Sequence, residues 1–439
     1  MRTLLLTTIM IAVFSLEAVA QSPVVAPAQK KPVMLMGGTV HTGTGIVIEN
    51  GAVAFSSGKI TFVGTTSAIN FDQSGFEIID VSGKQVYPGL IFPNTSVGLV
   101  EIGGVDVTVD NRESGDLNPN VRALAAYNTD SHVIPVIRAN GILLAQIVPQ
   151  GTLLPGTSSV VQLDAWNWED AAYKADNGLM MGWPRKSGFS GRGRTTMLQS
   201  PSEATSAYDK NVEQLEKIFA DAVAYAAVEK PADVNLRLEA MRGLFDGSKV
   251  LFISAPEPKG IIAAVLFAKR YGVRKMVLNG ASESAWTVKD FLKENNIPVI
   301  LANPLSLPQN EESDIRLPFK LASLFTREGI LVGLTYSSQA YGNLPFAAGQ
   351  TVPYGLTKEE ALQTVTLNTA KILDIADKTG SLELGKDANI VVSTGDILDM
   401  KSNNIEYAFI SGRNISLDNK HKQLYRRFQA KYDDLKTVR

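Results

Sequence analysis

Short apolar runs that end in polar residues alternate with longer helical patterns through the middle of this chain. Seven such runs occupy residues 86–91, 142–148, 160–163, 250–253, 275–278, 298–301 and 330–334. Runs of this length are typical of buried strands, and their alternation with helices predicts a parallel α/β sheet or barrel. An eighth strand at residues 179–183 would complete a (β/α)8 barrel of the TIM type.

The two ends of the chain follow a different pattern, with alternating apolar residues separated by glycines. Near the amino end this pattern covers residues 33–36, 46–48, 52–55 and 59–63, and near the carboxyl end it covers residues 389–393 and 407–410. Alternation with a period of two indicates short antiparallel strands. We expect the two ends to pair into one small composite β-sandwich.

Two helices have clear boundary signals. Thr357 and Glu360 form a T-x-x-E capping box, which predicts a helix that begins there and continues through Ala361. Another helix is expected over residues 263–271, where Gly272 ends it.

The last segment of the chain is expected to be an amphipathic helix. Leu424, Phe428, Tyr432 and Leu435 are spaced by four, four and three residues, which places them in one stripe with basic residues opposite. Such a stripe favours docking onto the body of the same chain, and the alternative is a surface for a partner.

The first 20 residues have the features of an export signal. Arg2 supplies a positive charge, residues 4–16 are largely apolar, and Ala18 and Ala20 form a small-x-small cleavage pattern. This apolar run is shorter than the roughly 20 residues that a spanning helix needs, and Glu17 ends it. The pattern predicts a cleaved signal peptide, a periplasmic or secreted mature protein, and no membrane anchor.

Composition and charge exclude several classes of function. The chain has 42 basic and 44 acidic residues, a formal charge of −2, which gives no field that favours nucleic acid or an anionic membrane. It has no cysteine, which excludes disulfides, zinc–cysteine sites and cysteine nucleophiles. Its three histidines are His41, His132 and His421, and none ends a predicted barrel strand, where sites on this fold are built.

Three motifs resemble the amidohydrolase superfamily, particularly its imidazolonepropionase-like members. Residues 88–99 (PGLIFPNTSVGL) resemble the first barrel strand of that family, P-G-hydrophobic-I-D-x-H-x-H, without its two histidines. Residues 355–362 (GLTKEEAL) resemble a late helix, and residues 380–392 (GSLELGKDANIVV) resemble the return strand, G-x-hydrophobic-x-x-G-K-x-A-D.

The resemblance implies a domain plan. It consists of a signal peptide at 1–20, a β module split between 21–87 and 389–416, a barrel at 88–388 and a terminal helix at 417–439.

The resemblance also implies where metal ligands would stand. The family takes them from the carboxyl ends of barrel strands, and the matching positions in this chain are Asn94, Ser96, Ser254, Asn279 and Ser337. We find no equivalent of the family's bridging lysine. We expect these five side chains to converge into a degenerate pocket. Because hydroxyl and amide groups are weak ligands for zinc, we expect no metal and no other cofactor, and the catalytic residues stay unassigned.

Three hypotheses about function follow from the resemblance and the lost ligands. The first is a non-catalytic subunit that forms a homo-oligomer or a hetero-oligomer with an active amidohydrolase paralogue, through the terminal helix or the basic loop 185–194. The second is an atypical hydrolase of C–N bonds in small or cyclic amides. The third is a barrel that binds a small-molecule ligand in the old pocket.

Overall fold

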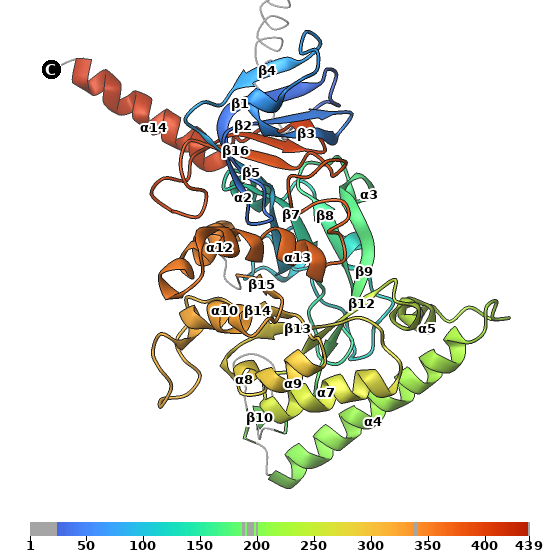
Figure 1. The fold of residues 1–439 in the computed structure, drawn as a ribbon. Coiled ribbons are helices and arrows are strands. Elements are labelled where there is room, and N and C mark those ends of the chain that lie inside the picture. Colours follow the sequence, from blue (N-terminus) through green and yellow to red (C-terminus); the bar gives the residue numbers. More distant parts are fainter. Residues whose placement is uncertain (1–23, 187–188, 191–196, 199–200, 337–340, 438–439) are drawn as a thin grey trace, which may run out of the picture.

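The computed structural model describes residues 24–186, 189–190, 197–198, 201–336 and 341–437. The described chain forms a β module and an α/β barrel, which lie one above the other in Figure 1. The first 20 residues and Ser337 lie outside the described residues, as do residues 187–188 and 191–194 of the basic loop.

The β module joins both ends of the chain in one connected sheet. Its strand order is β18-β17-β16-β5-β1-β2-β3, with β4 paired to β1. The two ends meet where β16 runs antiparallel to β5, with Val391 opposite Tyr87. The composite module expected from the sequence is therefore confirmed. Its strands are β1 (Val33–His41), β2 (Val47–Ser56), β3 (Lys59–Thr65), β4 (Glu77–Asp80), β5 (Gln85–Pro88), β16 (Ile390–Ser393), β17 (Ile405–Ile410) and β18 (Arg413–Asn414).

The barrel is an eight-stranded sheet in the order β15-β14-β13-β12-β9-β8-β7-β6. The Thr335 hydroxyl, just after β15, donates to the carbonyl oxygen of Pro93 in β6 at 2.6 Å, so the two edges of the sheet meet. The TIM-like fold class is confirmed. The strands are β6 (Leu90–Thr95), β7 (Ile142–Ile147), β8 (Gly156–Gln162), β9 (Ala172–Gly182), β12 (Val250–Ser254), β13 (Met276–Ala281), β14 (Val299–Leu301) and β15 (Val332–Leu334).

The barrel departs from eight parallel strands at β8, which runs antiparallel to both of its neighbours. Only residues 148–155 separate β7 from β8, and only residues 163–171 separate β8 from β9. A parallel crossover needs a dozen or more residues, so connections this short force the chain to reverse. The run expected over residues 86–91 also divides at Gly89, between β5 of the module and β6 of the barrel.

Helices cover the outside of the barrel (Figure 1). The capping box is present as expected, since the Glu360 backbone N–H donates to the Thr357 hydroxyl and the Glu360 side chain accepts from the Thr357 N–H. The helix expected at 263–271 is α7, which begins five residues earlier. The helices longer than four residues are α2 (Val133–Arg138), α4 (Pro201–Ala226), α5 (Leu236–Met241), α7 (Pro258–Arg270), α9 (Lys289–Glu294), α10 (Leu317–Arg327), α11 (Leu344–Gly349), α12 (Lys358–Thr364), α13 (Leu367–Ile372) and α14 (Lys420–Thr437).

Shorter elements complete the described chain. The helices of four residues are α3 (Trp168–Ala171), α6 (Gly243–Asp246) and α8 (Glu283–Trp286). Several 3-10 turns are also present, and β10 (Phe189–Ser190) pairs with β11 (Met197–Leu198). Within the described ranges, no helix combines the length and the apolar character that crossing a membrane would require.

The terminal helix α14 extends away from the body (Figure 1). Leu424, Phe428 and Tyr432, expected to dock onto the same chain, are exposed. That expectation is wrong for these three residues, because no other part of the described chain lies against them as core. The side chain of Leu435 lies outside the described residues.

Candidate functional site

The end of β6 holds two of the predicted site residues, Asn94 and Ser96. Asn94 has a left-handed backbone, with φ of 53°, which asparagine tolerates better than most residues. Its N–H donates to the Gln146 side-chain oxygen of β7 at 3.1 Å. The Ser96 hydroxyl lies 3.3 Å from the Tyr341 hydroxyl. The first strand therefore ends in a turn of neutral polar groups.

Two further predicted residues meet across the neighbouring strands β12 and β13. Ser254 is the last residue of β12, and its hydroxyl lies 3.5 Å from the side-chain nitrogen of Asn279. Ser254 is exposed, whereas Asn279 is only 4% exposed and its Oδ1 atom is buried without a hydrogen-bond partner. The structure thus brings this pair together at one end of the barrel. No contact joins it directly to Asn94 and Ser96 among the interactions of the described residues.

The sequence interpretation missed a buried polar chain inside the barrel. The Gln146 amide donates to the Ser158 hydroxyl at 3.1 Å, and that hydroxyl donates to the Asn177 side-chain oxygen at 3.0 Å. All three side chains are buried. The available signal was a lone polar residue within an apolar strand, as Gln146 is in the run ILLAQI.

The donors at this end of the barrel do not fit a divalent transition metal. Zinc is held by thiolates, imidazoles and carboxylates, whereas the four described predicted positions supply only amides and hydroxyls. In the described parts of the chain, no three or more His, Asp or Glu side chains gather in a way that could hold a metal ion. The donors present therefore give no basis for a metal-dependent step at this site.

The histidines lie elsewhere, as expected from the sequence. His132 precedes α2, where its Nδ1 atom lies 2.7 Å from a Glu101 carboxylate oxygen, and His421 lies in α14. Lys174, a lysine in β9, bonds the Asp374 carboxylate at 2.7 Å and its carbonyl oxygen at 2.6 Å. None of these side chains is placed to act with Ser254 or Asn279.

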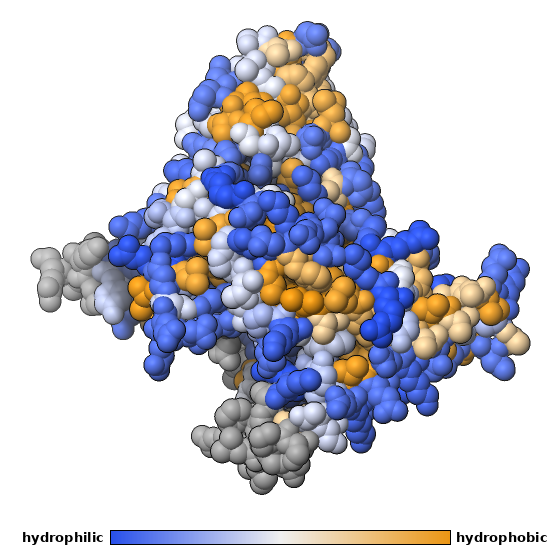
Figure 2. All heavy atoms as spheres, turned by 60° about the horizontal axis from the view of Figure 1, so that its bottom comes forward, coloured by the Kyte–Doolittle hydropathy of each residue, from blue (hydrophilic) through white to orange (hydrophobic). Residues whose placement is uncertain are grey.

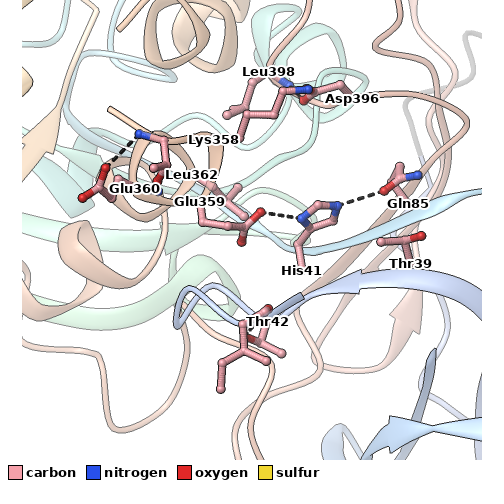
Figure 3. Close-up of polar contacts among 12 residues, drawn as sticks. Thr39, His41, Thr42, Gln85, Lys358, Glu359, Glu360, Leu362, Asp396 and Leu398 are labelled. Atoms are coloured by element: carbon pink, nitrogen blue, oxygen red, sulfur yellow. Dashed lines mark hydrogen bonds and ion pairs between the residues drawn. The ribbon is translucent and has the colours of Figure 1, made fainter. Parts of the chain in front are cut away.

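His41 belongs to a second polar cluster, at the junction of the β module and the barrel (Figure 3). Its Nδ1 lies 2.6 Å from Glu359 of α12, and its Nε2 lies 2.9 Å from the Gln85 side-chain oxygen. Its ring stacks on Tyr87 with 4.4 Å between centroids. Together with Lys358 and Asp396, which pair at 2.8 Å, these residues line a cavity of about 190 Å³.

The two acceptors around His41 favour its charged form. Burial by itself lowers the pKa of His41, but the hydrogen bonds to Glu359 and Gln85 and the charge of Glu359 outweigh burial, so the pKa is raised above 6.5. Both ring nitrogens then donate, and an imidazolium–carboxylate pair joins β1 to α12. The strength of this link between module and barrel therefore depends on the protonation of His41, and so on pH.

We expect the free energy of unfolding to fall as the pH rises above 6.5. A histidine whose folded pKa is raised stabilises the fold fully below the unfolded pKa, and the contribution is lost as the pH rises through the folded pKa. Thermal melting between pH 6 and 9 would measure this. His41→Gln should flatten the decline, while His132→Gln, a change at an exposed histidine, should leave it as in the wild type. An equal decline in His41→Gln and wild type would contradict the assignment.

Comparison with known proteins gives matches over most of the chain. A model of the amidohydrolase family matches residues 193–415, just over half of the sequence. An imidazolonepropionase of Mesorhizobium japonicum is 23% identical over 378 residues, covering 80% of this chain and 87% of that protein. An imidazolonepropionase of Bacillus thuringiensis is 53% identical over 49 residues, 11% of each chain.

The fold is also similar to solved structures. An amidohydrolase from Thermotoga maritima superposes with a TM-score of 0.75 and 24% sequence identity, covering 88% of this chain and 99% of that one. At this level of sequence identity, the similarity is evidence for the fold alone.

Proposed function

This chain belongs to the amidohydrolase family, and on that premise we propose that it is an exported member without the catalytic metal centre, acting as a non-catalytic subunit of a larger assembly. The resemblance read from the sequence motifs is confirmed by the family match and by the fold. Export, the loss of catalysis and the assembly are parts of the proposal.

The observation that carries the proposal is the neutral donor set at the ends of the barrel strands. Asn94, Ser96, Ser254 and Asn279 stand where the family motifs carry metal ligands. Without such an ion, nothing evident among them lowers the pKa of an attacking water toward neutrality. A hydrolytic step of the ordinary metal-dependent kind has no support from these residues.

The replacement is also consistent with a stable fold. Charged ligands left in a barrel without their ion would be buried and unpaired, which is costly. Asn279 is buried but neutral, so its cost is limited to one unpartnered amide oxygen. A barrel with neutral groups at these positions can persist as a scaffold.

Mature protein purified without chelators is expected to carry at most about one tenth of an equivalent of zinc, manganese or iron, because amide and hydroxyl groups bind such ions weakly. Elemental analysis before and after incubation with excess zinc and desalting would measure the content. Near-stoichiometric metal that is lost in both Ser254→Ala and Asn279→Ala would overturn the proposal. Turnover of small or cyclic amides would favour the atypical hydrolase instead.

A second candidate function, binding of a small molecule in the barrel, is favoured by one observation. The Asn279 Oδ1 atom is buried without a partner, beside the exposed Ser254. A ligand with an N–H group would satisfy that oxygen. Calorimetric titration with neutral cyclic amides tests this candidate, and binding that survives Asn279→Ala would count against it.

The surface offers apolar area for the assembly. Hydrophobic atoms are exposed between hydrophilic ones on the face drawn in Figure 2. Leu305 and Met400 are 42% and 64% exposed and line one cavity of about 700 Å³, and Leu307, two residues after Leu305, is 80% exposed. Exposed apolar groups that share a cavity are typical of a partner surface.

We expect the mature protein to form a homo-oligomer, or a hetero-oligomer with a barrel-sized partner, that buries at least about 1,000 Å². Light scattering and pull-down from the native compartment would report it. Leu307→Glu with Met400→Glu should weaken the assembly at least about tenfold, since charge would be buried in the interface. Ile102→Glu with Val107→Glu, at positions that are 57% and 87% exposed and outside this cavity, is the matched control. A monomer at micromolar concentration without a partner would refute the subunit proposal.

A further inference from the structure

The terminal helix α14 carries an apolar face that nothing in the described chain covers. Leu424, Tyr425, Phe428 and Tyr432 are 37%, 69%, 54% and 57% exposed. The hydrophobic core draws on Ile415 and Leu417 just before the helix, but on no described residue within it. The helix extends away from the body (Figure 1), so a large partner surface can reach its apolar face without contacting the barrel.

These four side chains lie on one side of the helix. At about 100° per residue, they fall within an arc of about 100°. Three of them are aromatic, and two are tyrosines with a polar tip on an apolar ring. Tyrosine is enriched where one end of a side chain is apolar and the other is wet, as at a membrane–water interface.

Basic residues border one side of this face. Lys420, Arg427 and Lys431 lie along that border, whereas Lys422 and Arg426 lie on the far side of the helix. Arg426 pairs with Asp418, which precedes the helix, at 2.8 Å. Asp433 lies on the side away from the apolar face, where it accepts hydrogen bonds from Gln429.

The charge of this segment differs from that of the whole chain. Residues 417–439 contain seven basic and three acidic residues, a net charge of +4, whereas the complete chain has a net charge of −2. The rest of the chain is therefore at −6. The near-neutral total, which by itself gives no attraction to anionic surfaces, conceals a strongly basic end.

We propose that α14 binds the surface of a bilayer that contains anionic phospholipids, lying in the plane of the membrane with its aromatic face toward the acyl chains. An apolar face bordered by lysines and arginines is typical of helices that lie in the interface. The long side chains of Lys420, Arg427 and Lys431 can reach the phosphates from the basic border while their methylene stems cover apolar surface. The helix is about 27 Å long, at 1.5 Å per residue for 18 residues.

The charges disfavour a second copy of the helix as the occupant of this face. Two α14 helices that paired antiparallel along their apolar faces would bring their basic borders together, and in either direction two segments of net charge +4 would repel. An anionic bilayer meets the basic border with opposite charge.

Flotation with vesicles tests the proposal, using the mature protein isolated after export. On vesicles of phosphatidylglycerol and phosphatidylcholine in equal parts, the bound fraction should exceed that on pure phosphatidylcholine at least about tenfold in low salt and fall in about 0.5 M salt. Absence of this preference would overturn the proposal.

Paired variants locate the binding surface. Phe428→Ser with Tyr432→Ser removes apolar area, and Arg427→Glu with Lys431→Glu reverses the charge of the basic border, so each should lower partitioning at least about fivefold. Lys217→Glu with Lys230→Glu makes the same charge change on the body and should alter it less than about twofold. Because the four substituted α14 side chains are exposed and belong to no core cluster, melting temperatures should not change. If both α14 variants partition onto vesicles as the wild type does, the assignment to α14 is refuted.

A fluorescent reporter separates insertion from simple adhesion. The chain has no cysteine, so one can be introduced at a single position and labelled with an environment-sensitive dye. The dye at Phe428→Cys should shift to the blue on anionic vesicles, and the dye at Ala430→Cys, on the opposite side of the helix, should not. Equal shifts at both positions would contradict in-plane binding. An oligomer that requires α14, in protein that does not bind vesicles, would assign the face to a protein partner instead.

Discussion

Replacing Asp164 with alanine is expected to lower the free energy of unfolding by about 3 to 5 kcal/mol, because it removes the shared partner of two charged side chains in a buried network. Asp164 follows β8, and its side chain is 3% exposed. Its carboxylate accepts from Arg138 at 2.5 Å and from Arg413 at 2.8 Å. It also accepts from the N–H of Ala26 at 3.0 Å. The change leaves two guanidinium groups facing each other in a poorly hydrated place.

This network connects parts of the chain that are far apart in sequence. Arg138 ends α2 beside the barrel, Arg413 lies in β18 of the module, and Ala26 belongs to the segment before β1. Urea titration followed by circular dichroism would measure the loss. Asp290→Ala removes an exposed carboxylate from its pair with Lys289 and should cost less than about 0.5 kcal/mol. A loss below about 1 kcal/mol in Asp164→Ala would show that the network contributes little.

Replacing Phe252 with alanine is expected to cost about 3 to 5 kcal/mol, because it leaves a cavity in the barrel. Phe252 lies in β12, is fully buried and packs in the same cluster as Ile91 and Ile300. Its ring occupies the space over Gly178 of β9, where an added Cβ would come within 2.3 Å of the ring. The glycine and the phenylalanine are thus complementary.

A double-mutant cycle tests that complementarity. Gly178→Ala should be strongly destabilising in the wild type and less so in Phe252→Ala, where the ring is gone, which gives a coupling of about 0.5 to 3 kcal/mol. Part of the cost remains, since the Val250 carbonyl oxygen would still lie 2.8 Å from the new Cβ. Leu266→Ala, at a half-exposed position of α7, should change stability by less than about 0.5 kcal/mol. Additive costs would contradict the packing described for β9 and β12.

Much of the barrel could be predicted from the chain because buried strands are short and apolar. The runs near 142–148, 250–253 and 330–334 all became strands of the barrel. The direction of β8 could not be inferred from its apolar pattern, since a buried strand looks the same in both directions. The shortness of residues 148–155 was the signal for reversal, because no crossover helix fits there.

The residues of the candidate site could be predicted from motifs, whereas the polar contacts around them could not. Ser254 and Asn279 were found because the family motifs mark the ends of barrel strands, and the structure places them 3.5 Å apart. The buried chain from Gln146 through Ser158 to Asn177 brings three strands together, so no local pattern contains it. The cluster around His41 and Glu359 was missed for the same reason, since 318 positions separate the two residues.

The sequence by itself determined most of the barrel strands, the family and the neutral residues at the barrel ends, because each depends on local periodicity or a local motif. The shared alternating pattern of the two chain ends predicted that they pair, and the structure shows which strands do so. Only the tertiary structure decided the reversal of β8, the junction of His41 with Glu359, the network at Asp164 and the exposure of α14. The first three depend on which distant segments meet. The periodicity of α14 predicts an apolar face whether or not anything covers it, and only the packing of residues 24–437, in their described parts, shows that no segment there lies over this face.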